Sequence, residues 1–321
     1  MQKLVTVFGG SGFVGRYVVR SLAKDGWRIR VAVRRPHLAG DLRVMGDVGQ
    51  VEIVQANVRN RASIALALVG ADAVVDLVGV LFSKGAQSFS ALHLDAAQAI
   101  AEEAATAGVG KLVHISALGA DANSKSQYAR TKAQGEAAVR AAFPKATIVR
   151  PSVVFGPEDN FFNKFAGMAA MAPALPLIGG GKTRFQTIYA GDVGSAVAAI
   201  LALPTAAPLY EIGGPGVYSF KTLMELISKE TMRQPMLLPI PFGIAGLIGL
   251  AGDIAAAVLP LAPPLTRDQV EMLKSDNVAE QGAPGLKSLK IQPTALEAVL
   301  PTYLWRFRKN GQFAVPLGAD V

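Results

Sequence analysis

Apolar and polar positions alternate in blocks along the first 150 residues. Short runs rich in β-branched residues are separated by longer stretches with helical spacing, a pattern typical of a parallel sheet covered by helices on both faces. The runs predict strands at 4–8, 28–33, 51–54, 73–77, 111–115 and 147–150, and the longer stretches predict helices at 13–25, 87–107 and 126–142. The pattern therefore predicts an α/β fold with a doubly wound parallel sheet.

The pattern changes after Pro151, where proline and glycine become frequent. Strand-like pieces at 185–189 and 209–212 flank a helical stretch at 191–203, and we expect both pieces to return to the same sheet. The predicted organisation is a main domain over 1–156, completed by 185–214, and a smaller, mostly helical C-terminal lobe formed by 157–184 and 215–321.

Residues 236–266 form an apolar segment in which Asp253 is the single ionisable residue. Pro239 and Pro241 interrupt its beginning, so the predicted helix runs from 242 to 259. A membrane-spanning helix needs about 20 apolar residues and disfavours a central carboxylate, so we do not expect it to span. Burial in the core and docking on a partner or membrane both remain open, and we call 236–266 the apolar docking segment.

Composition excludes several classes of protein. Hydrophobic residues make up 51% and charged residues 17%, the opposite of a disordered chain. There is no cysteine, which excludes disulfides and thiolate ligands, and the three histidines are far apart in sequence, so we expect no metal site. The apolar run after Met1 is shorter than a secretory signal, which predicts a cytoplasmic protein.

The net charge of +8 is concentrated near the start of the chain. Residues 1–43 hold nine basic side chains against Asp25 and Asp41, and the rest of the chain is nearly neutral. A nucleic-acid-binding protein usually spreads basic residues over a whole face. The concentration indicates a local anionic ligand, and no nucleic-acid partner is expected.

A glycine-rich turn lies between the first predicted strand and helix. It consists of Gly9, Gly10, Ser11, Gly12, Phe13, Val14 and Gly15 and fits G-x-G-x-x-G from Gly10. Glycines allow a pyrophosphate to approach the backbone, and the helix N-terminus offers it free N–H groups. In this strand–turn–helix context the motif predicts a Rossmann domain that binds a dinucleotide.

Two arginines predict which dinucleotide binds. NAD-selective domains usually carry an acidic residue after the second strand, but here Arg34 and Arg35 follow Val33. Guanidinium groups bind a ribose 2′-phosphate, and Arg16 is close enough in sequence to the glycines to contribute. We therefore expect NADP(H) as the cofactor.

Tyr128 and Lys132 form a Y-x-x-x-K motif on the predicted helix 126–142. The spacing places phenol and ammonium on one helix face, where a lysine can lower the pKa of a tyrosine from about 10 and make it an acid or base. With the glycine-rich turn, this motif resembles the extended or atypical short-chain dehydrogenases/reductases. That resemblance implies that Tyr128 and Lys132 contact the cofactor, together with Asn57, Val78, Gly79, Ile115, Pro151 and Val154.

The sequence departs from the catalytic pattern of that family. Active members carry a serine or threonine near the end of the fifth strand, a position that falls on Ala117 here, with Ser116 one residue early. Asn57 stands where an aspartate is common, and Asp95 where an asparagine is usual. The candidate catalytic residues are Tyr128, Lys132 and the displaced Ser116, and turnover is an open question.

A second motif narrows the resemblance. Residues 148–161, IVRPSVVFGPEDNF, fit R-P-S-x-x-F-G-x-x-D-x-F. This motif resembles an atypical branch that contains the dehydrogenase-like accessory subunits (alpha subcomplex subunit nine) of respiratory complex I and their bacterial relatives. The resemblance covers almost the whole chain. It implies a non-catalytic, NADPH-binding subunit that supports assembly or stability of NADH:quinone oxidoreductase, with other complex I subunits as partners.

The same resemblance implies a peripheral position on the cytoplasmic face of the inner membrane. Basic residues near the chain end could meet anionic headgroups: Lys287, Lys290, Arg306, Arg308 and Lys309. The alternative function is a free NAD(P)H-dependent reductase or epimerase of the short-chain class, with Tyr128 as acid or base and Lys132 as its activator.

Overall fold

The computed structural model describes residues 2–258, 263 and 265–314, and the chain divides into two compact units. Unit 1 comprises Met1–Pro151, Ala190–Ile212 and Ala279–Gln292, and unit 2 comprises Ser152–Tyr189, Gly213–Val278 and Pro293–Val321. The chain thus passes between the units five times. The sequence placed the first boundary at 156 and assigned 279–292 to the C-terminal lobe.

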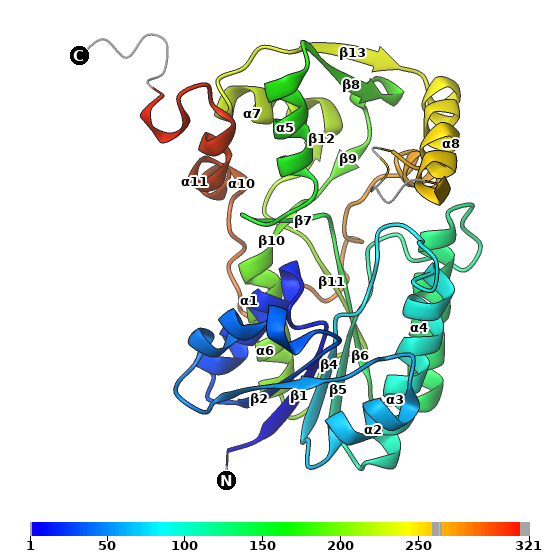
Figure 1. Ribbon diagram of the computed structural model, residues 1–321, viewed down its shortest axis with the longest axis vertical. Helices are drawn as coiled ribbons and strands as arrows, with labels where there is room; N and C mark the ends of the chain where they lie inside the picture. Colours follow the sequence, from blue (N-terminus) through cyan, green and yellow to red (C-terminus); the bar gives the residue numbers. More distant parts are fainter. Residues whose placement is uncertain (1, 259–262, 264, 315–321) are drawn as a thin grey trace. The chain divides into compact units, whose positions relative to one another are not determined.

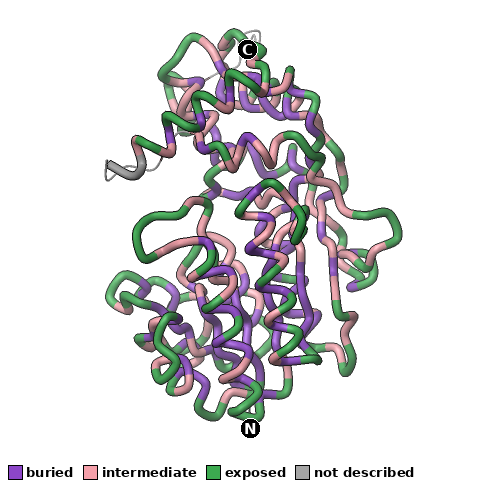
Figure 2. The backbone as a smooth tube through the Cα atoms, turned by 90° about the vertical axis from the view of Figure 1, so that its right-hand side faces the viewer, coloured by how far each residue is buried: buried purple, intermediate pink, exposed green. Residues whose placement is uncertain are grey.

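Unit 1 contains a seven-stranded sheet in the order β11-β6-β5-β4-β1-β2-β3, with every pairing parallel (Figure 1). The strands are β1 (Leu4–Phe8), β2 (Arg28–Val33), β3 (Val51–Gln55), β4 (Ala73–Asp76), β5 (Lys111–Ile115), β6 (Thr147–Pro151) and β11 (Leu209–Ile212). The central strands are buried on both faces because helices cover both, and Figure 2 shows them as a buried centre. The predicted doubly wound Rossmann fold is confirmed.

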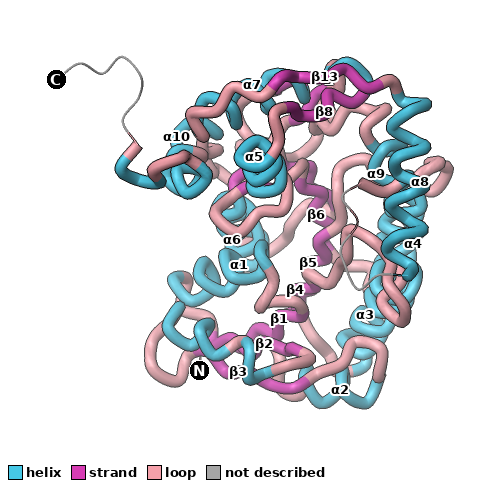
Figure 3. The backbone as a smooth tube through the Cα atoms, turned by 45° about the horizontal axis from the view of Figure 1, so that its top comes forward, coloured by secondary structure: helices cyan, strands magenta, loops and turns pink. Residues whose placement is uncertain are grey.

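Helices pack on both faces of this sheet (Figure 3). One face carries α1 (Phe13–Lys24) and α6 (Ala190–Ala202), and the other carries α2 (Arg61–Leu68), α3 (Ala96–Thr106) and α4 (Gln127–Ala142). A π-helix, Ser90–Asp95, leads directly into α3. The sequence predicted one helix over this region and gave no sign of its π-helical beginning.

Unit 2 is mostly helical and adds three two-stranded sheets. Its elements are β7 (Val154–Phe155), α5 (Phe162–Met171), β8 (Ala174–Ile178), β9 (Arg184–Phe185), β10 (Ile188–Tyr189), β12 (Tyr218–Ser219), α7 (Phe220–Glu230), β13 (Met236–Ile240), α8 (Phe242–Val258), α9 (Arg267–Met272), α10 (Leu296–Val299) and α11 (Pro301–Leu304). Phe155, Phe162 and Phe220 are almost completely buried and form the aromatic centre of its core.

The expectation that 185–189 joins the large sheet is wrong. Within this stretch β9 pairs with β12, and β10 pairs with β7. The free edge of β6 is occupied by β11, which pairs along its length, so no position beside it is left for another strand. The second predicted piece, 209–212, does join the sheet as β11.

The apolar docking segment contains β13, which pairs with β8, and α8. The predicted helix end at 259 lies outside the described residues. Ala245 and Gly249 are buried and Phe242 is half-buried, whereas five other large apolar side chains of α8 are exposed: Ile244, Leu247, Ile248, Leu250 and Ile254. No helix in the described part of the chain combines the length and apolarity needed to cross a membrane. These five side chains are therefore not part of the core, and we call them the α8 apolar face.

Candidate dinucleotide-binding site

The glycine-rich turn connects β1 to α1 and leaves the helix N-terminus open. Gly9 has a φ of +81°, and its carbonyl accepts a hydrogen bond from Gly12 N at 3.0 Å. Gly12 is the N-cap of α1, and no side chain of a described residue caps this helix. The first amides of α1 can therefore donate to an anion at this end.

Two further glycines make the turn this tight. A Cβ on Gly15 would lie 2.3 Å from Gly9 O, and a Cβ on Gly10 would lie 2.6 Å from a methyl group of Val31. A side chain at Gly15 would push α1 away from the turn, and one at Gly10 would displace the turn or the side chain of Val31 in β2. The local geometry thus fits a pyrophosphate that approaches the backbone closely.

A pocket of about 290 Å³ lies beyond the ends of β2 and β3. Its lining consists of Arg34, Gln55, Ala56, Asn57, Asn60 and Ser63. Arg34 and Arg35 are exposed, and neither forms an ion pair with any residue in the described ranges. Arg16 is different, because its guanidinium is paired with Asp41. Arg34 is therefore the cation available in this pocket.

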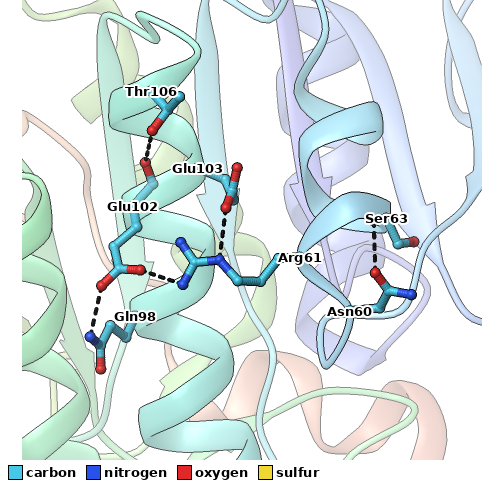
Figure 4. A network of polar contacts seen from close by, with 7 residues as sticks. All are labelled: Asn60, Arg61, Ser63, Gln98, Glu102, Glu103 and Thr106. Atoms are coloured by element: carbon cyan, nitrogen blue, oxygen red, sulfur yellow. Dashed lines mark hydrogen bonds and ion pairs between the residues drawn. The ribbon is translucent and has the colours of Figure 1, made fainter.

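A polar network fixes the wall of the pocket (Figure 4). Asn60 caps α2 by accepting from Ser63 N at 3.3 Å. Ser63 Oγ in turn accepts from Asn57 N at 2.9 Å. Arg61 then ties α2 to α3 through Glu102 at 2.6 Å and Glu103 at 2.9 Å. Asn57, the residue in place of the common aspartate, is held by its own backbone contacts at the edge of the pocket.

Lys132 is buried on the inner face of α4. Its Nζ donates to the carbonyl of Ile115 at 3.1 Å, and a Cβ on Gly79 would lie 3.4 Å from the same atom. Burial lowers the pKa of Lys132 to about 8, although the carboxylates of Asp76 and Glu136 act to raise it. The structure thus brings Lys132, Ile115 and Gly79 together, three of the predicted cofactor contacts.

Tyr128 lies one turn before Lys132 on the same helix, and Ser126 caps that helix by accepting from Ala129 N at 3.1 Å. The half-buried tyrosine ring packs edge-on against His93, with centroids 5.2 Å apart, and against Phe89 at 5.8 Å. The rotation of Tyr128 is therefore restricted by two aromatic neighbours that the sequence did not identify.

His93 is completely buried and joins three segments of the site. Its Nε2 accepts from Val80 N at 3.1 Å, so the proton resides on Nδ1, which lies 3.1 Å from Thr131 Oγ1. Burial, followed by the charge of Lys132, lowers the pKa of His93 to about 3. His93 is therefore a neutral group that links the loop after β4 to α4. Asp95, the position noted from the family pattern, is exposed.

Ser116 is buried, and its Oγ has no hydrogen-bond partner among the described residues. Ala117, where the family carries its hydroxyl, is only half-buried. The hydroxyl of Ser116 therefore has no exposed surface, while the more accessible neighbouring position has no hydroxyl.

Asp76 and His114 are further residues that the sequence did not place in the site. Asp76 ends β4 and is in register with His114, the second-to-last residue of β5. Both are 1% exposed, and His114 Nδ1 lies 2.8 Å from Asp76 Oδ2. In the sequence, they could have been recognised as a pair of ionisable residues near the ends of two apolar strands that are predicted to be adjacent.

The remaining predicted contacts fall in both units. Val78 and Gly79 follow β4, and Pro151 ends β6, all in unit 1, whereas Val154 is in β7 of unit 2. In the described ranges, no group of three His, Asp or Glu side chains could hold a metal ion.

Sequence similarity to known proteins extends along nearly the whole chain. A subunit named NADH dehydrogenase (ubiquinone) 1 alpha subcomplex subunit 9 from Arabidopsis thaliana is 33% identical over 96% of this chain and 79% of its own. The protein of that name from Mus musculus is 34% identical over 92% and 78%. A ceramide reductase of Caulobacter vibrioides is 32% identical over 74% of each chain.

Solved structures agree on the fold. A Thermus thermophilus UDP-glucose 4-epimerase in complex with NAD has a TM-score of 0.69 at 18% identity, covering 95% of this chain and 99% of its own. A Streptomyces venezuelae dTDP-glucose 4,6-dehydratase has a TM-score of 0.68 at 19% identity, with coverage of 95% and 96%. The model of the NAD dependent epimerase/dehydratase family matches residues 5–213. On this match and these relatives, the chain belongs to the NAD dependent epimerase/dehydratase family.

Proposed function

We propose that this protein is a non-catalytic, NADPH-binding accessory subunit of respiratory NADH:quinone oxidoreductase. The observation that carries the proposal is similarity over 96% of the chain to a subunit of that name, since it extends beyond the dinucleotide-binding residues into unit 2. The bound dinucleotide then stabilises unit 1, because any ligand that binds the folded state alone shifts the folding equilibrium.

The preference for NADP(H) is supported by the pocket beyond β2. Arg34 lines it, has no acidic partner in the described chain, and can form charge-assisted bonds to a 2′-phosphate. Titration of NADPH and NADH tests this. Arg34→Ala/Arg35→Ala should weaken NADPH binding about tenfold or more and leave NADH nearly unchanged, while Arg28→Ala, an exposed arginine at the other end of β2, should change neither. Equal loss for both dinucleotides would contradict the assignment.

The lack of turnover is supported by residues 116 and 117. Ser116 Oγ is enclosed, and Ala117 offers no hydroxyl to polarise a substrate oxygen. A nicotinamide dinucleotide supplies hydride transfer when bound, but this chain does not present the third group that normally accompanies Tyr128 and Lys132.

Assembly with other subunits is supported by the α8 apolar face. Leu247 is 68% exposed and Ile254 is 60% exposed, and α8 carries no basic residue that would attract anionic lipid. Arg306 and Arg308 are also engaged within unit 2, the first by Pro157 O at 2.7 Å and the second by Glu230 O at 2.7 Å. We therefore propose that α8 contacts a protein partner, and that the chain lies peripherally at the cytoplasmic face of the inner membrane.

Native-gel analysis of the solubilised respiratory complex tests the assembly. The wild-type chain should migrate with the complex, and Leu247→Glu/Ile254→Glu should release it while NADPH binding persists. Leu66→Glu, at an exposed leucine of α2, is the matched control and should stay bound. Absence of the wild-type chain from the complex would overturn the proposed function. Retention of the α8 variant in the complex would overturn the assignment of this face. A variant that loses only its binding to anionic vesicles would overturn it too.

A second candidate is a free NAD(P)H-dependent reductase or epimerase. It is favoured by the retained Tyr128 and Lys132 on one face of α4 and by the similarity to a ceramide reductase. Tyr128 would hold the proton at the substrate oxygen, with Lys132 beside the cofactor ribose. Turnover of carbonyl substrates by the purified protein, abolished in Tyr128→Phe with NADPH affinity unchanged, would establish this function instead.

A further inference from the structure

The Lys132 ammonium lies between two backbone segments. On one side it donates to Ile115 O at 3.1 Å, at the end of β5. On the other side is Gly79, in the loop after β4, where a Cβ would come within 3.4 Å of Nζ. The position of the ammonium therefore depends on how these two segments are held.

Asp76 holds both of them. Its Oδ1 accepts from the backbone N–H of Val78 at 3.0 Å, and its Oδ2 accepts from His114 Nδ1 at 2.8 Å. Val78 directly precedes Gly79, and His114 directly precedes Ile115. One buried carboxylate thus fixes the backbone on both sides of the lysine.

The titratable and charged groups around Lys132 lie on five elements: α4, β4, β5, β6 and the π-helix. Glu136, one turn further along α4, is bound by Arg150 of β6 through two bonds of 2.8 and 2.7 Å, so its charge is balanced. His93 of the π-helix is neutral, and Tyr128 shares the helix face. Asp76 instead accepts from an imidazole and an amide, not from an arginine or lysine. Asp76 is therefore the carboxylate near Lys132 that no arginine or lysine of the described residues pairs with.

We propose that Asp76 is the positioning residue of Lys132: it fixes the Val78–Gly79 and His114–Ile115 backbone and keeps the ammonium protonated for the hydroxyl groups of the dinucleotide. The inference rests on the proposed dinucleotide binding and adds a residue outside the glycine and Y-x-x-x-K motifs. It explains why an ionisable residue ends an otherwise apolar central strand.

The pH dependence of NADPH affinity provides the test. Wild-type affinity should fall as pH rises through about 8, because burial lowers the pKa of Lys132 to about 8 and the neutral amine donates less strongly. Asp76→Asn retains size and one acceptor but removes the charge, so the midpoint should move at least about one pH unit lower. Asp47→Asn, at an exposed aspartate, should leave the midpoint unchanged.

A second variant separates charge from packing. In Asp76→Asn/Lys132→Arg the guanidinium stays charged, since its pKa exceeds about 12, and NADPH affinity should become nearly independent of pH between 7 and 9. An Asp76→Asn midpoint equal to that of wild type would overturn the proposal. Wild-type protein that binds neither NADPH nor NADH at any pH would overturn the dinucleotide function itself.

Folding of the variants is followed by circular dichroism. If Asp76→Asn does not fold, the Asp76→Asn/Lys132→Met protein decides the question. Recovery of a cooperative melt there would support the proposal, because removal of the ammonium removes the charge left unbalanced. No recovery would show that Asp76 supports the backbone alone and would overturn its electrostatic role.

Discussion

His93 has a protonation state fixed by its surroundings. Val80 N–H donates to Nε2, and the neighbouring Lys132 further disfavours a second proton on the ring, which has a lowered pKa of about 3. The unfolded chain would take up this proton near pH 6.5. Between these two values the unfolded state binds more protons than the folded state, so stability falls as pH decreases.

We predict that this linkage is visible in the free energy of unfolding. Between pH 6.5 and 5 the wild-type protein should lose about 2 kcal/mol through His93, at about 1.4 kcal/mol per pH unit. His93→Gln should show a flatter dependence in urea titrations at pH 7, 6 and 5. His37→Gln, at an exposed histidine, is the control and should follow wild type. A His93→Gln slope equal to that of wild type would exclude the linkage.

At the scale of single residues, the sequence predicted those residues whose motifs depend on local spacing. The glycine-rich turn, Tyr128 and Lys132 lie within short segments, and their arrangement follows from one turn and one helix. Asp76, His93 and His114 are far from each other in sequence, and only the β4–β5 pairing and the packing of the π-helix bring them together. Their roles could not be predicted without strand order.

The contact between α4 and the π-helix depends on one glycine. A Cβ on Gly135 would lie 2.0 Å from His93 O, so the two helices approach more closely than any other residue would allow. This approach places α4, with Tyr128 and Lys132, against the loop after β4. The helix pair therefore sets the geometry of the site.

Gly135→Ala should move α4 outward and destabilise the protein. The expected loss is about 1–3 kcal/mol, despite a gain of up to about 1 kcal/mol in helix propensity. Gly243→Ala in α8 is the matched control, because nothing lies within 4 Å of its added Cβ, and it should be neutral or slightly stabilising. Thermal melts compare the two, and NADPH affinity should fall only in Gly135→Ala. A Gly135→Ala melting temperature at or above that of wild type would contradict the close contact.

Elements were predicted well where the local sequence pattern determines them, and poorly where pairing with another strand determines them. The strands of the large sheet through β6, and β11, lie close to their predicted positions because each is a short apolar run between turn residues. The piece 185–189 has the same local pattern, but β11 already occupies the edge of β6. Competition between strands for one edge is not encoded in the pattern of either strand.

At the scale of the whole molecule, two regions correspond to the two unusual features of the composition, the basic excess and the low charged fraction. Of the basic residues near the start, Arg34 lines the pocket, whereas Arg16 pairs with Asp41 and Arg30 pairs with Glu52. The low charged fraction is most evident in unit 2, where α8 exposes Ile244, Leu247 and Ile254. Arg34 therefore lies at the site proposed for the dinucleotide, and the exposed apolar side chains of α8 form the surface proposed for a partner.

Unit 1 is built from three separate segments of the chain, so a fragment that contains only the first segment should not fold. Residues 1–156 match the first domain read from the sequence, yet they lack α6 and β11. Val193, Val197 and Ile200 of α6 are at most 2% exposed, and each buried side chain of this size contributes about 1.5–3 kcal/mol. Their loss alone is comparable with the total stability of a domain, about 5–15 kcal/mol, and the edge of β6 would also lose its partner.

We expect the fragment 1–156 to show no cooperative melt by circular dichroism and to bind a dye that reports exposed apolar surface. The fragment 1–214 restores α6 and β11 and should melt cooperatively, although Glu211 N would still lack Pro284 O, its partner at 2.9 Å. NADPH should raise the melting temperature of the longer fragment and leave the shorter one unchanged. Cooperative melting of 1–156 would show that the first six strands and their own helices suffice, and that α6 and β11 are additions to a fold already complete.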